Sequence, residues 1–127
     1  MTAPKTILVV DDAALVRVYY RSILEGAGFR VVEALNGLEA LETLLAVGVD
    51  LLIVDINMPQ MDGLTFLRTL REKVGPMASI PALMTSTESA PADFAAARAA
   101  GANYYLLKPV EREQLVEFAR MLCGVSS

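Results

Sequence analysis

Hydrophobic residues in this chain gather in five short runs, separated by longer stretches in which they recur at helical spacing. The runs are Thr6–Val10, Val31–Ala34, Leu51–Val54, Ala82–Met84 and Tyr104–Leu107. Runs of about five residues with few polar interruptions are typical of strands that are buried on both faces, as in a parallel sheet. The pattern therefore predicts five buried, parallel strands.

The stretches between the runs carry apolar residues at the period of an amphipathic helix. Three helices are expected to bury the following stripes: Val16, Tyr20, Ile23, Leu24 and Ala27; Leu38, Leu41 and Leu45; and Leu115, Ala119 and Leu122. The alanine-rich segment Ala92–Ala100 is also strongly helix-forming. Left-handed cap residues are predicted after helical stretches, at Gly28, Gly48, Gly75 and Gly101.

The alternation of strands and helices predicts a single α/β domain, which we expect to span residues 1–127. Parallel strands joined by right-handed crossovers place helices on both faces of a sheet. The predicted fold is therefore a (βα)5 doubly wound sandwich. Ligands of such folds bind at the carboxyl ends of the strands, near the point where the strand order reverses. The residues at the strand ends thus decide the function.

Composition excludes several classes of protein. The chain has 127 residues, of which 54% are hydrophobic, so we expect a packed core. The formal net charge is -4 and no run of Lys or Arg occurs, which argues against nucleic-acid binding. The apolar runs are too short to span a bilayer, and residues 1–6 lack the apolar core of a signal peptide. We expect a cytoplasmic protein that does not insert into membranes.

The chain contains one cysteine and no histidine. An internal disulfide is therefore excluded, as are zinc sites built on histidine, Ser-His-Asp triads and histidine general bases. Any metal site must use oxygen ligands, and such ligands favour magnesium or calcium.

Polar side chains follow four of the five predicted strands. They are Asp11 and Asp12 after the first, Asp55 after the third, Thr85 and Ser86 after the fourth, and Lys108 after the fifth. Because the carboxyl ends of parallel strands meet at one edge of the sheet, we expect these side chains to converge. Three carboxylates placed close together repel one another and would not all stay ionised without a cation.

This set of groups suits a magnesium-assisted phosphoryl transfer. Asp12 and Asp55 could bind Mg²⁺ directly, while Asp11 holds a coordinated water. Lys108 supplies a positive charge for a phosphoryl oxygen, and Thr85 can donate a hydrogen bond to that oxygen. Catalysis of this reaction rests mostly on positioning and charge neutralisation. A carboxylate nucleophile would form an acyl phosphate.

Five motifs in order along the chain resemble those of two-component response-regulator receivers, and more narrowly of the stand-alone, CheY-like class. They are Leu8-Val9-Val10-Asp11-Asp12, Val54-Asp55-Ile56-Asn57-Met58-Pro59, Met61-Asp62-Gly63, Met84-Thr85-Ser86 and Leu107-Lys108-Pro109. Each motif alone is weak, whereas five with fitting spacing are specific. The resemblance implies a flavodoxin-like sheet with the strand order 2-1-3-4-5 and a single receiver domain over residues 1–127.

The resemblance also implies a role for each site residue. Asp55 would accept a phosphoryl group, and Mg²⁺ would be bound by Asp12, Asp55 and the backbone carbonyl of Asn57, with Asp11 assisting through water. Lys108 would contact the phosphoryl group, and its bond to Pro109 would be cis. Thr85 would be the switch hydroxyl and Tyr105 the switch aromatic.

The implied partners follow from this chemistry. The phosphoryl donor would be a CheA-like histidine kinase or a histidine phosphotransfer protein. The domain would be a signalling switch, not an enzyme, and a monomer. Because the sequence ends at Ser127, we expect output through a bound partner such as a flagellar motor switch protein or a phosphatase.

Most of these residues also have ordinary structural explanations. Asp11 or Asp12 could serve only as the cap of the next helix, and Asp55 could belong to a polar turn. Thr85 fits a strand by its β-propensity, and Lys108 could simply extend its ammonium toward water. Their expected convergence favours the functional reading.

Other residues are expected to be structural. Tyr104 and Tyr105 should point to opposite faces of their strand, one into the core and one partly exposed, and only the family spacing selects Tyr105. Cys123 is expected to pack as a small hydrophobe. Arg68, Arg71 and Lys73 are expected on a solvated helix face.

Three functions compete with that of a chemotaxis switch. The first is a relay or phosphate-sink receiver. It gains support because residues 86–97 include Glu88 and Asp93 but no basic residue, where some chemotaxis members carry lysines. The second is a small Mg²⁺-dependent phosphatase. These enzymes place two acids as Asp-x-Asp after the first strand, whereas Ala13 stands at the second position here. The third, a non-phosphorylated interaction domain, is disfavoured by the acidic set.

Overall fold

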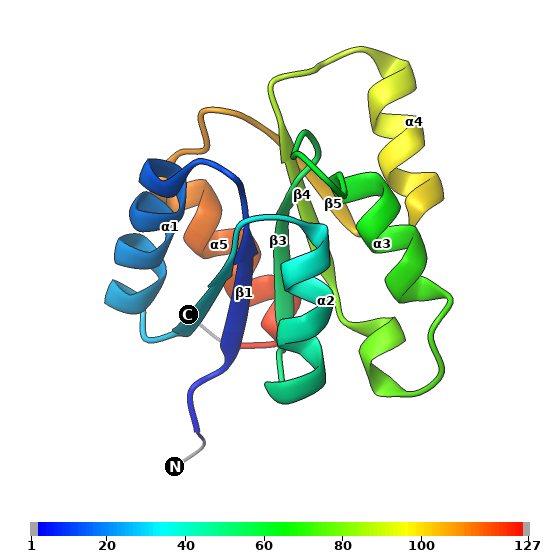
Figure 1. Ribbon diagram of the computed structural model, residues 1–127. Helices are drawn as coiled ribbons and strands as arrows, with labels where there is room; N and C mark the ends of the chain where they lie inside the picture. Colours follow the sequence, from blue (N-terminus) through cyan, green and yellow to red (C-terminus); the bar gives the residue numbers. More distant parts are fainter. Residues whose placement is uncertain (1–2, 126–127) are drawn as a thin grey trace.

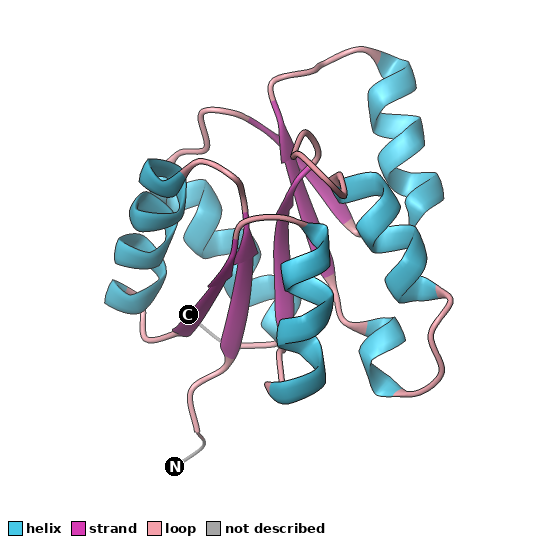
Figure 2. Cartoon of the chain, in the orientation of Figure 1, coloured by secondary structure: helices cyan, strands magenta, loops and turns pink. Residues whose placement is uncertain are grey.

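The computed structural model describes residues 3–125 and contains a five-stranded parallel sheet with helices on both faces (Figures 1 and 2). The elements are β1 (Thr6–Val10), α1 (Ala14–Gly26), β2 (Arg30–Ala34), α2 (Gly37–Ala46), β3 (Leu51–Asp55), α3 (Gly63–Arg71), η1 (Pro76–Ser79), β4 (Ala82–Ser86), α4 (Pro91–Ala100), β5 (Tyr104–Leu107) and α5 (Arg112–Cys123). The strand order β2-β1-β3-β4-β5 confirms the predicted fold. Residues 1, 2, 126 and 127 of the expected domain lie outside the described residues.

Two apolar layers hold the sheet between its helices. Successive side chains of a strand point to opposite faces, so Ile7 and Val9 join one layer and Leu8 and Val10 join the other. Helices α1 and α5 cover the first layer, and α2, α3 and α4 cover the second (Figure 1). None of the helices in residues 3–125 is both long and apolar enough to cross a membrane.

Burial on both faces is confirmed for the three central strands, β1, β3 and β4. The edge strands differ, because the helical layers cover them less completely: Tyr104 and Leu107 of β5 are 45% and 44% exposed. Strands β3 and β4 are also longer than predicted. Asp55 pairs in register with Thr85, so the polar residues expected just after these strands are their last members.

The predicted apolar stripes are confirmed for α1 and α5, whereas in α2 only Leu41 of the predicted stripe packs against the core. Leu38 and Leu45 of α2 are exposed, whereas Ala40 and Leu44 are buried. The reason lies in close packing at the start of the helix, where a side chain on Gly37 would collide with Met61. Gly37, Ala40 and Leu44 therefore form the inner face of α2, and Leu38 and Leu45 face outward.

Two of the predicted glycine caps are correct in conformation. Gly28 and Gly101 have φ angles of 97° and 107°, and Gly101 is the cap of α4. Gly48 does not have this conformation, because α2 ends at Ala46 and the chain leaves it through Val47 with extended backbone. Gly75 has a positive φ of 100°, but it precedes η1, a short 3-10 helix that the sequence pattern did not predict.

The prediction of a solvated basic face on α3 is wrong for one of its three residues. Arg68 and Lys73 are exposed, but Arg71 is half-buried. The guanidinium of Arg71 donates hydrogen bonds of 2.7 to 3.1 Å to the backbone carbonyls of Ala78, Ile80 and Gly101. Arg71 therefore ties the end of α3 to η1 and to the end of α4.

The start of α3 lies directly against the end of β3. The Gly63 amide donates a 2.8 Å hydrogen bond to the carbonyl of Ile56, and a Cβ on Gly63 would overlap the carbonyl oxygen of Asp55. We predict that Gly63→Ala lowers the free energy of unfolding by roughly 1 to 3 kcal/mol, because backbone must move to make room. Urea unfolding followed by circular dichroism measures this change.

Gly26→Ala is the matched control. No atom lies within 4 Å of a Cβ at Gly26 in α1, so this variant should be neutral or more stable by up to about 1 kcal/mol. Equal unfolding midpoints for the two variants would contradict the close approach of α3 to Asp55.

Candidate functional site

Asp11, which directly follows β1, is held on all sides. It is 1% exposed, and its amide donates to the carbonyl of Ala34 at 3.1 Å. Its carboxylate accepts hydrogen bonds from the amide of Ala13 at 2.9 Å and from the ammonium of Lys108 at 2.8 Å. The capping position of α1 is occupied by Ala13, so the alternative that Asp11 or Asp12 only caps this helix does not hold.

The structure brings three carboxylates together at the carboxyl edge of the sheet. Asp12 is exposed at the rim, whereas Asp55 is buried at the end of β3. One carboxylate oxygen from each of Asp11, Asp12 and Asp55 lies within 4.8 Å of the others. Like charges this close raise the cost of ionising each group.

Lys108 enters the same cluster from the end of β5. Its peptide bond to Pro109 is cis, and its ammonium lies 2.8 Å from Asp11 and 3.4 Å from Oδ1 of Asp55. The side chain is 19% exposed. The ammonium is therefore paired with buried carboxylates, and the alternative in which it only reaches for water does not hold.

The pKa values show how the cluster balances its charges. Burial and the charge of Asp11 raise the pKa of Asp55 to about 6, against the opposing effects of Lys108 and of the Asn57 amide. Burial alone would lower the pKa of Lys108, but its hydrogen bond to Asp11 and the charges of Asp55 and Asp11 raise it. Lys108 therefore stays charged while Asp55 is the carboxylate that is costly to ionise.

Thr85 is fully buried next to Asp55 in the sheet register. Within residues 3–125, its hydroxyl is the one buried side-chain polar atom that has no hydrogen-bond partner of good geometry, although it lies near enough to the Tyr20 phenol to oppose the effect of burial, which raises the pKa of Tyr20 to about 12. Such a group typically costs about 1 to 3 kcal/mol, so its presence beside the acids fits a site that binds a polar ligand. Ser86 differs, because its hydroxyl accepts a 3.0 Å hydrogen bond from the amide of Glu88.

Tyr104 and Tyr105 point to opposite faces, as predicted, but neither is a core residue. Tyr104 packs edge-on against Phe118 of α5, with ring centroids 5.0 Å apart. Tyr105 packs against Phe94 of α4 at 4.6 Å, and its hydroxyl donates a 2.8 Å hydrogen bond to the carbonyl of Glu88. Tyr105 therefore links β5 to α4 and to the loop that precedes α4.

The chemistry of the acidic cluster fits Mg²⁺. Its donors are carboxylate oxygens, which this ion prefers, and a divalent cation would offset the cost of ionising Asp55, whose pKa burial and the charge of Asp11 raise. The Asn57 amide faces the Asp55 carboxylate. The position of the Asn57 carbonyl relative to the other donors stays a prediction.

Comparison with known proteins decides the family. A family model described as the response regulator receiver domain matches residues 7–120. The chain belongs to the response regulator receiver family. It is also similar in structure to a putative response regulator from Chloroflexus aurantiacus (TM-score 0.88, 34% identity, 95% of this chain and 98% of that one). The chemotaxis protein CheY4 of Vibrio cholerae is similar too (TM-score 0.88, 32% identity, 94% and 99%).

Curated relatives match this receiver domain over part of their length. The CAI-1 autoinducer sensor kinase/phosphatase CqsS of Vibrio cholerae is 32% identical over 88% of this chain and 16% of its own length. A protein-glutamate methylesterase/protein-glutamine glutaminase of Archaeoglobus fulgidus is 53% identical over 53% of this chain and 20% of its own. The receiver domain therefore spans a fifth or less of these two relatives.

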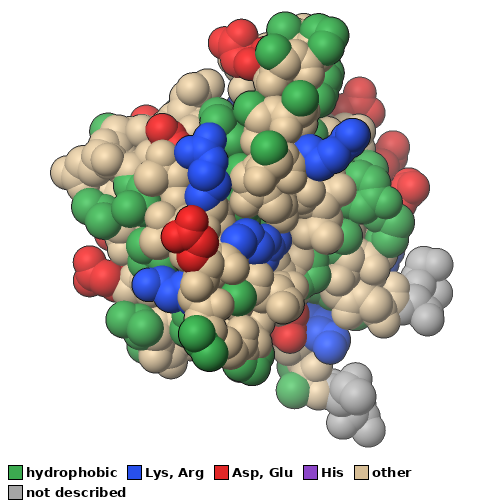
Figure 3. Space-filling view, turned by 90° about the vertical axis from the view of Figure 1, so that its right-hand side faces the viewer, with side chains coloured by type: hydrophobic (Ala, Val, Ile, Leu, Met, Phe, Trp, Pro, Cys, Tyr) green, Lys and Arg blue, Asp and Glu red, His purple; other side chains and the backbone are tan. Residues whose placement is uncertain are grey.

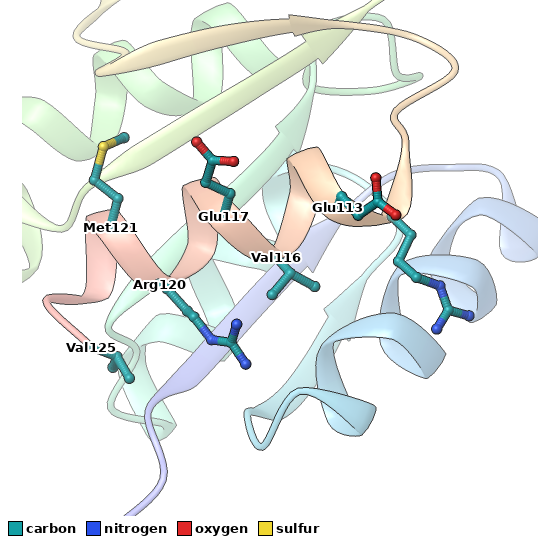
Figure 4. Close-up of a pocket in the computed structure, with 7 residues that line it drawn as sticks. Glu113, Val116, Glu117, Arg120, Met121 and Val125 are labelled. Carbon is teal, nitrogen blue, oxygen red and sulfur yellow. The ribbon is translucent and has the colours of Figure 1, made fainter. Parts of the chain in front are cut away.

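A wide groove on the receiver domain lies apart from the acidic cluster. It runs along α5 and is lined by side chains of both charges and by apolar ones, Arg112, Glu113, Val116, Glu117, Arg120, Met121 and Val125 (Figure 4). It shares no residue with the cluster. Another face, seen in Figure 3, also mixes basic, acidic and hydrophobic side chains.

Sequence reasoning about the receiver missed Arg17. This side chain of α1 donates a 2.6 Å hydrogen bond to the backbone carbonyl of Asp11 and a 2.9 Å bond to Glu33 of β2. Its partner at Asp11 is a backbone atom, and the sequence pattern carries no information about such a contact.

The raised pKa of Asp55 predicts a pH-dependent stability in the absence of divalent cations. The pKa is about 6 in the folded receiver against 3.8 in the unfolded chain, so stability falls as pH rises from about 4 to about 6. We predict that Asp55→Asn removes this effect. The variant should exceed the wild type in free energy of unfolding by up to about 3 kcal/mol at pH 7, with the difference closing near pH 4.

Urea unfolding in a chelator at both pH values measures the effect. Asp62→Asn is the control, because Asp62 is exposed at the start of α3 and asparagine also caps helices. A difference between Asp55→Asn and wild type that is equal at pH 4 and pH 7 would contradict the assignment.

Proposed function

We propose that this receiver domain accepts a phosphoryl group on Asp55 from the phosphohistidine of a histidine kinase or histidine phosphotransfer protein, in a Mg²⁺-dependent reaction. The observation that carries the proposal is the environment of Asp55. It is a buried carboxylate that has a fixed ammonium 3.4 Å from one oxygen and an unpartnered hydroxyl, that of Thr85, at the neighbouring register position.

The proposed chemistry uses each of these groups once. A carboxylate oxygen of Asp55 attacks phosphorus, the phosphorus–nitrogen bond of the donor breaks, and the imidazole leaves with the electron pair. Lys108 offsets negative charge on the phosphoryl oxygens, and Thr85 donates a hydrogen bond to one of them. Asp12, Asp55 and the Asn57 carbonyl would hold Mg²⁺, with Asp11 assisting through water, and the ion would supply charge neutralisation for the transferring group.

Phosphorylation is proposed to act through Thr85 and Tyr105. The modification adds up to two negative charges and strong hydrogen-bond acceptors at Asp55. Movement of Thr85 toward these acceptors would change the packing beside it, and Tyr105 contacts both α4 and the loop before α4. The surface formed by α4, β5 and α5 would then bind its partner with altered affinity.

Two outputs remain in competition. A chemotaxis switch is supported by 32% identity to CheY4 over 94% of the chain. A relay or phosphate sink is supported by the acidic character of the loop and helix after β4, where Glu88 and Asp93 stand without a basic residue up to Ala97. A small phosphatase is a distant third, since Ala13 replaces the second acid of the Asp-x-Asp pattern.

We predict that Asp55→Asn abolishes labelling by a small phosphodonor such as acetyl phosphate in the presence of Mg²⁺. The amide that replaces the carboxylate cannot form an acyl phosphate. Incorporation of acid-labile phosphate, measured by intact mass, tests the prediction. Asp62→Asn should label at the wild-type stoichiometry, and labelling of Asp55→Asn to that level would refute the assignment of the phosphoacceptor.

We further predict that a beryllium fluoride mimic of the phosphoryl group changes which proteins bind. The immobilised domain with Mg²⁺ is exposed to a lysate of the source organism, with the mimic added or omitted. Retention of a flagellar switch component only with the mimic would establish motor output. Asp55→Asn should retain that component under neither condition.

The relay alternative predicts a different result. Only kinases or histidine phosphotransfer proteins would then be retained, and the mimic would not change their recovery. That outcome would exclude motor output while leaving phosphorylation of Asp55 in place.

A further inference from the structure

The peptide bond between Asp11 and Asp12 makes a hydrogen bond, and so do the peptides before and after it. The carbonyl of Asp11 accepts a 2.6 Å hydrogen bond from Nη1 of Arg17. The amide of Asp11, on the preceding peptide, donates to Ala34 of β2. The amide of Ala13, on the following peptide, donates to the carboxylate of Asp11. Of the partners of these three peptides, only Arg17 reaches the backbone with a long side chain.

Arg17 is itself held in place. Its Nε donates a 2.9 Å hydrogen bond to one oxygen of Glu33, and the other oxygen of Glu33 accepts a 2.6 Å hydrogen bond from Nε of Arg21. The Arg17 side chain is 17% exposed and that of Glu33 is 26% exposed. The rigid fork of the guanidinium therefore bridges the carbonyl of Asp11 and the carboxylate of Glu33.

The orientation of this peptide matters for Asp12 more than for Asp11. Asp11 is fixed through its carboxylate by Lys108 and Ala13. Asp12 is exposed, so the direction in which its carboxylate leaves the backbone depends on the peptide plane that Arg17 holds. A carboxylate that must meet Asp55 across the cluster needs that direction to be set in advance.

We propose that Arg17 is a positioning residue for the magnesium site, acting through the Asp11 carbonyl to aim the Asp12 carboxylate at the ion. The inference rests on the proposed function, because it assigns Arg17 a role in the same acidic cluster. Groups that orient metal ligands typically change metal affinity about 10-fold to 100-fold when they are removed.

The sign of the effect separates positioning from simple electrostatics. A positive charge beside a cation site repels the cation, so loss of the Arg17 charge alone would tighten Mg²⁺ binding. Loss of positioning would weaken it. Arg21 offers the matched control, because it shares the Glu33 carboxylate with Arg17 and carries the same charge, while its hydrogen bonds run to Glu33 and Glu25.

The test is a titration of ¹⁵N-labelled protein with MgCl₂, following the backbone amides of residues 11–13 and 55 by NMR. We expect Arg17→Met to raise the dissociation constant for Mg²⁺ about tenfold, and Arg21→Met to leave it unchanged or slightly lower. Arg17→Lys should not restore wild-type affinity, because one ammonium lacks the fork that spans both acceptors. Melting temperatures in a chelator show whether each variant is folded.

Labelling by acetyl phosphate gives a second readout. If Arg17 positions the metal site, saturating Mg²⁺ should restore labelling of Arg17→Met to the wild-type level, whereas a general folding defect would persist. Equal Mg²⁺ affinity in wild type and Arg17→Met, or equal weakening in Arg17→Met and Arg21→Met, would overturn the inference alone. Absence of Mg²⁺-dependent shifts in the wild type would instead overturn the metal site of the proposed function.

Discussion

The burial of Asp55 beside the charge of Asp11 is the constraint to which the rest of the site responds. Burial, and after it the charge of Asp11, makes Asp55 costly to ionise, and one oxygen from each of Asp11, Asp12 and Asp55 lies within 4.8 Å of the others. Lys108 offsets part of this cost through its pairing with Asp11 and Asp55. A site in this condition favours the binding of a divalent cation, because the cation would offset the negative charge of the cluster.

The site residues that could be predicted from sequence are those that lie at the ends of strands. Asp11, Asp55, Thr85 and Lys108 stand at the ends of apolar runs, and parallel pairing brings such positions to one edge. Runs of this kind carry a strong signal because both faces of a central strand must be apolar. The order of the strands came from resemblance to a family, since periodicity alone does not determine which strands are neighbours.

The parts that could not be predicted depend on contacts with backbone atoms or on close packing. Arg17 and Arg71 look like ordinary basic residues of amphipathic helices, yet each donates to backbone carbonyls. The inner face of α2 was assigned to Leu38, Leu41 and Leu45, whereas Gly37, which closely contacts Met61, lies inside together with Ala40 and Leu44. In each case the deciding partner lies in another element of the fold.

Because Arg71 holds only the C-terminal end of α4, a small rotation of this helix about that end moves its N-terminal end the most. One end is tied through the carbonyl of Gly101 to α3, while the other end adjoins the loop whose carbonyl at Glu88 meets the hydroxyl of Tyr105. A helix of ten residues is about 15 Å long, so a rotation of roughly 4° about its fixed end displaces the other by about 1 Å. A displacement of that size is enough to break a 2.8 Å hydrogen bond. A rotation of α4 by a few degrees is therefore enough to make or break the hydrogen bond between Tyr105 and Glu88.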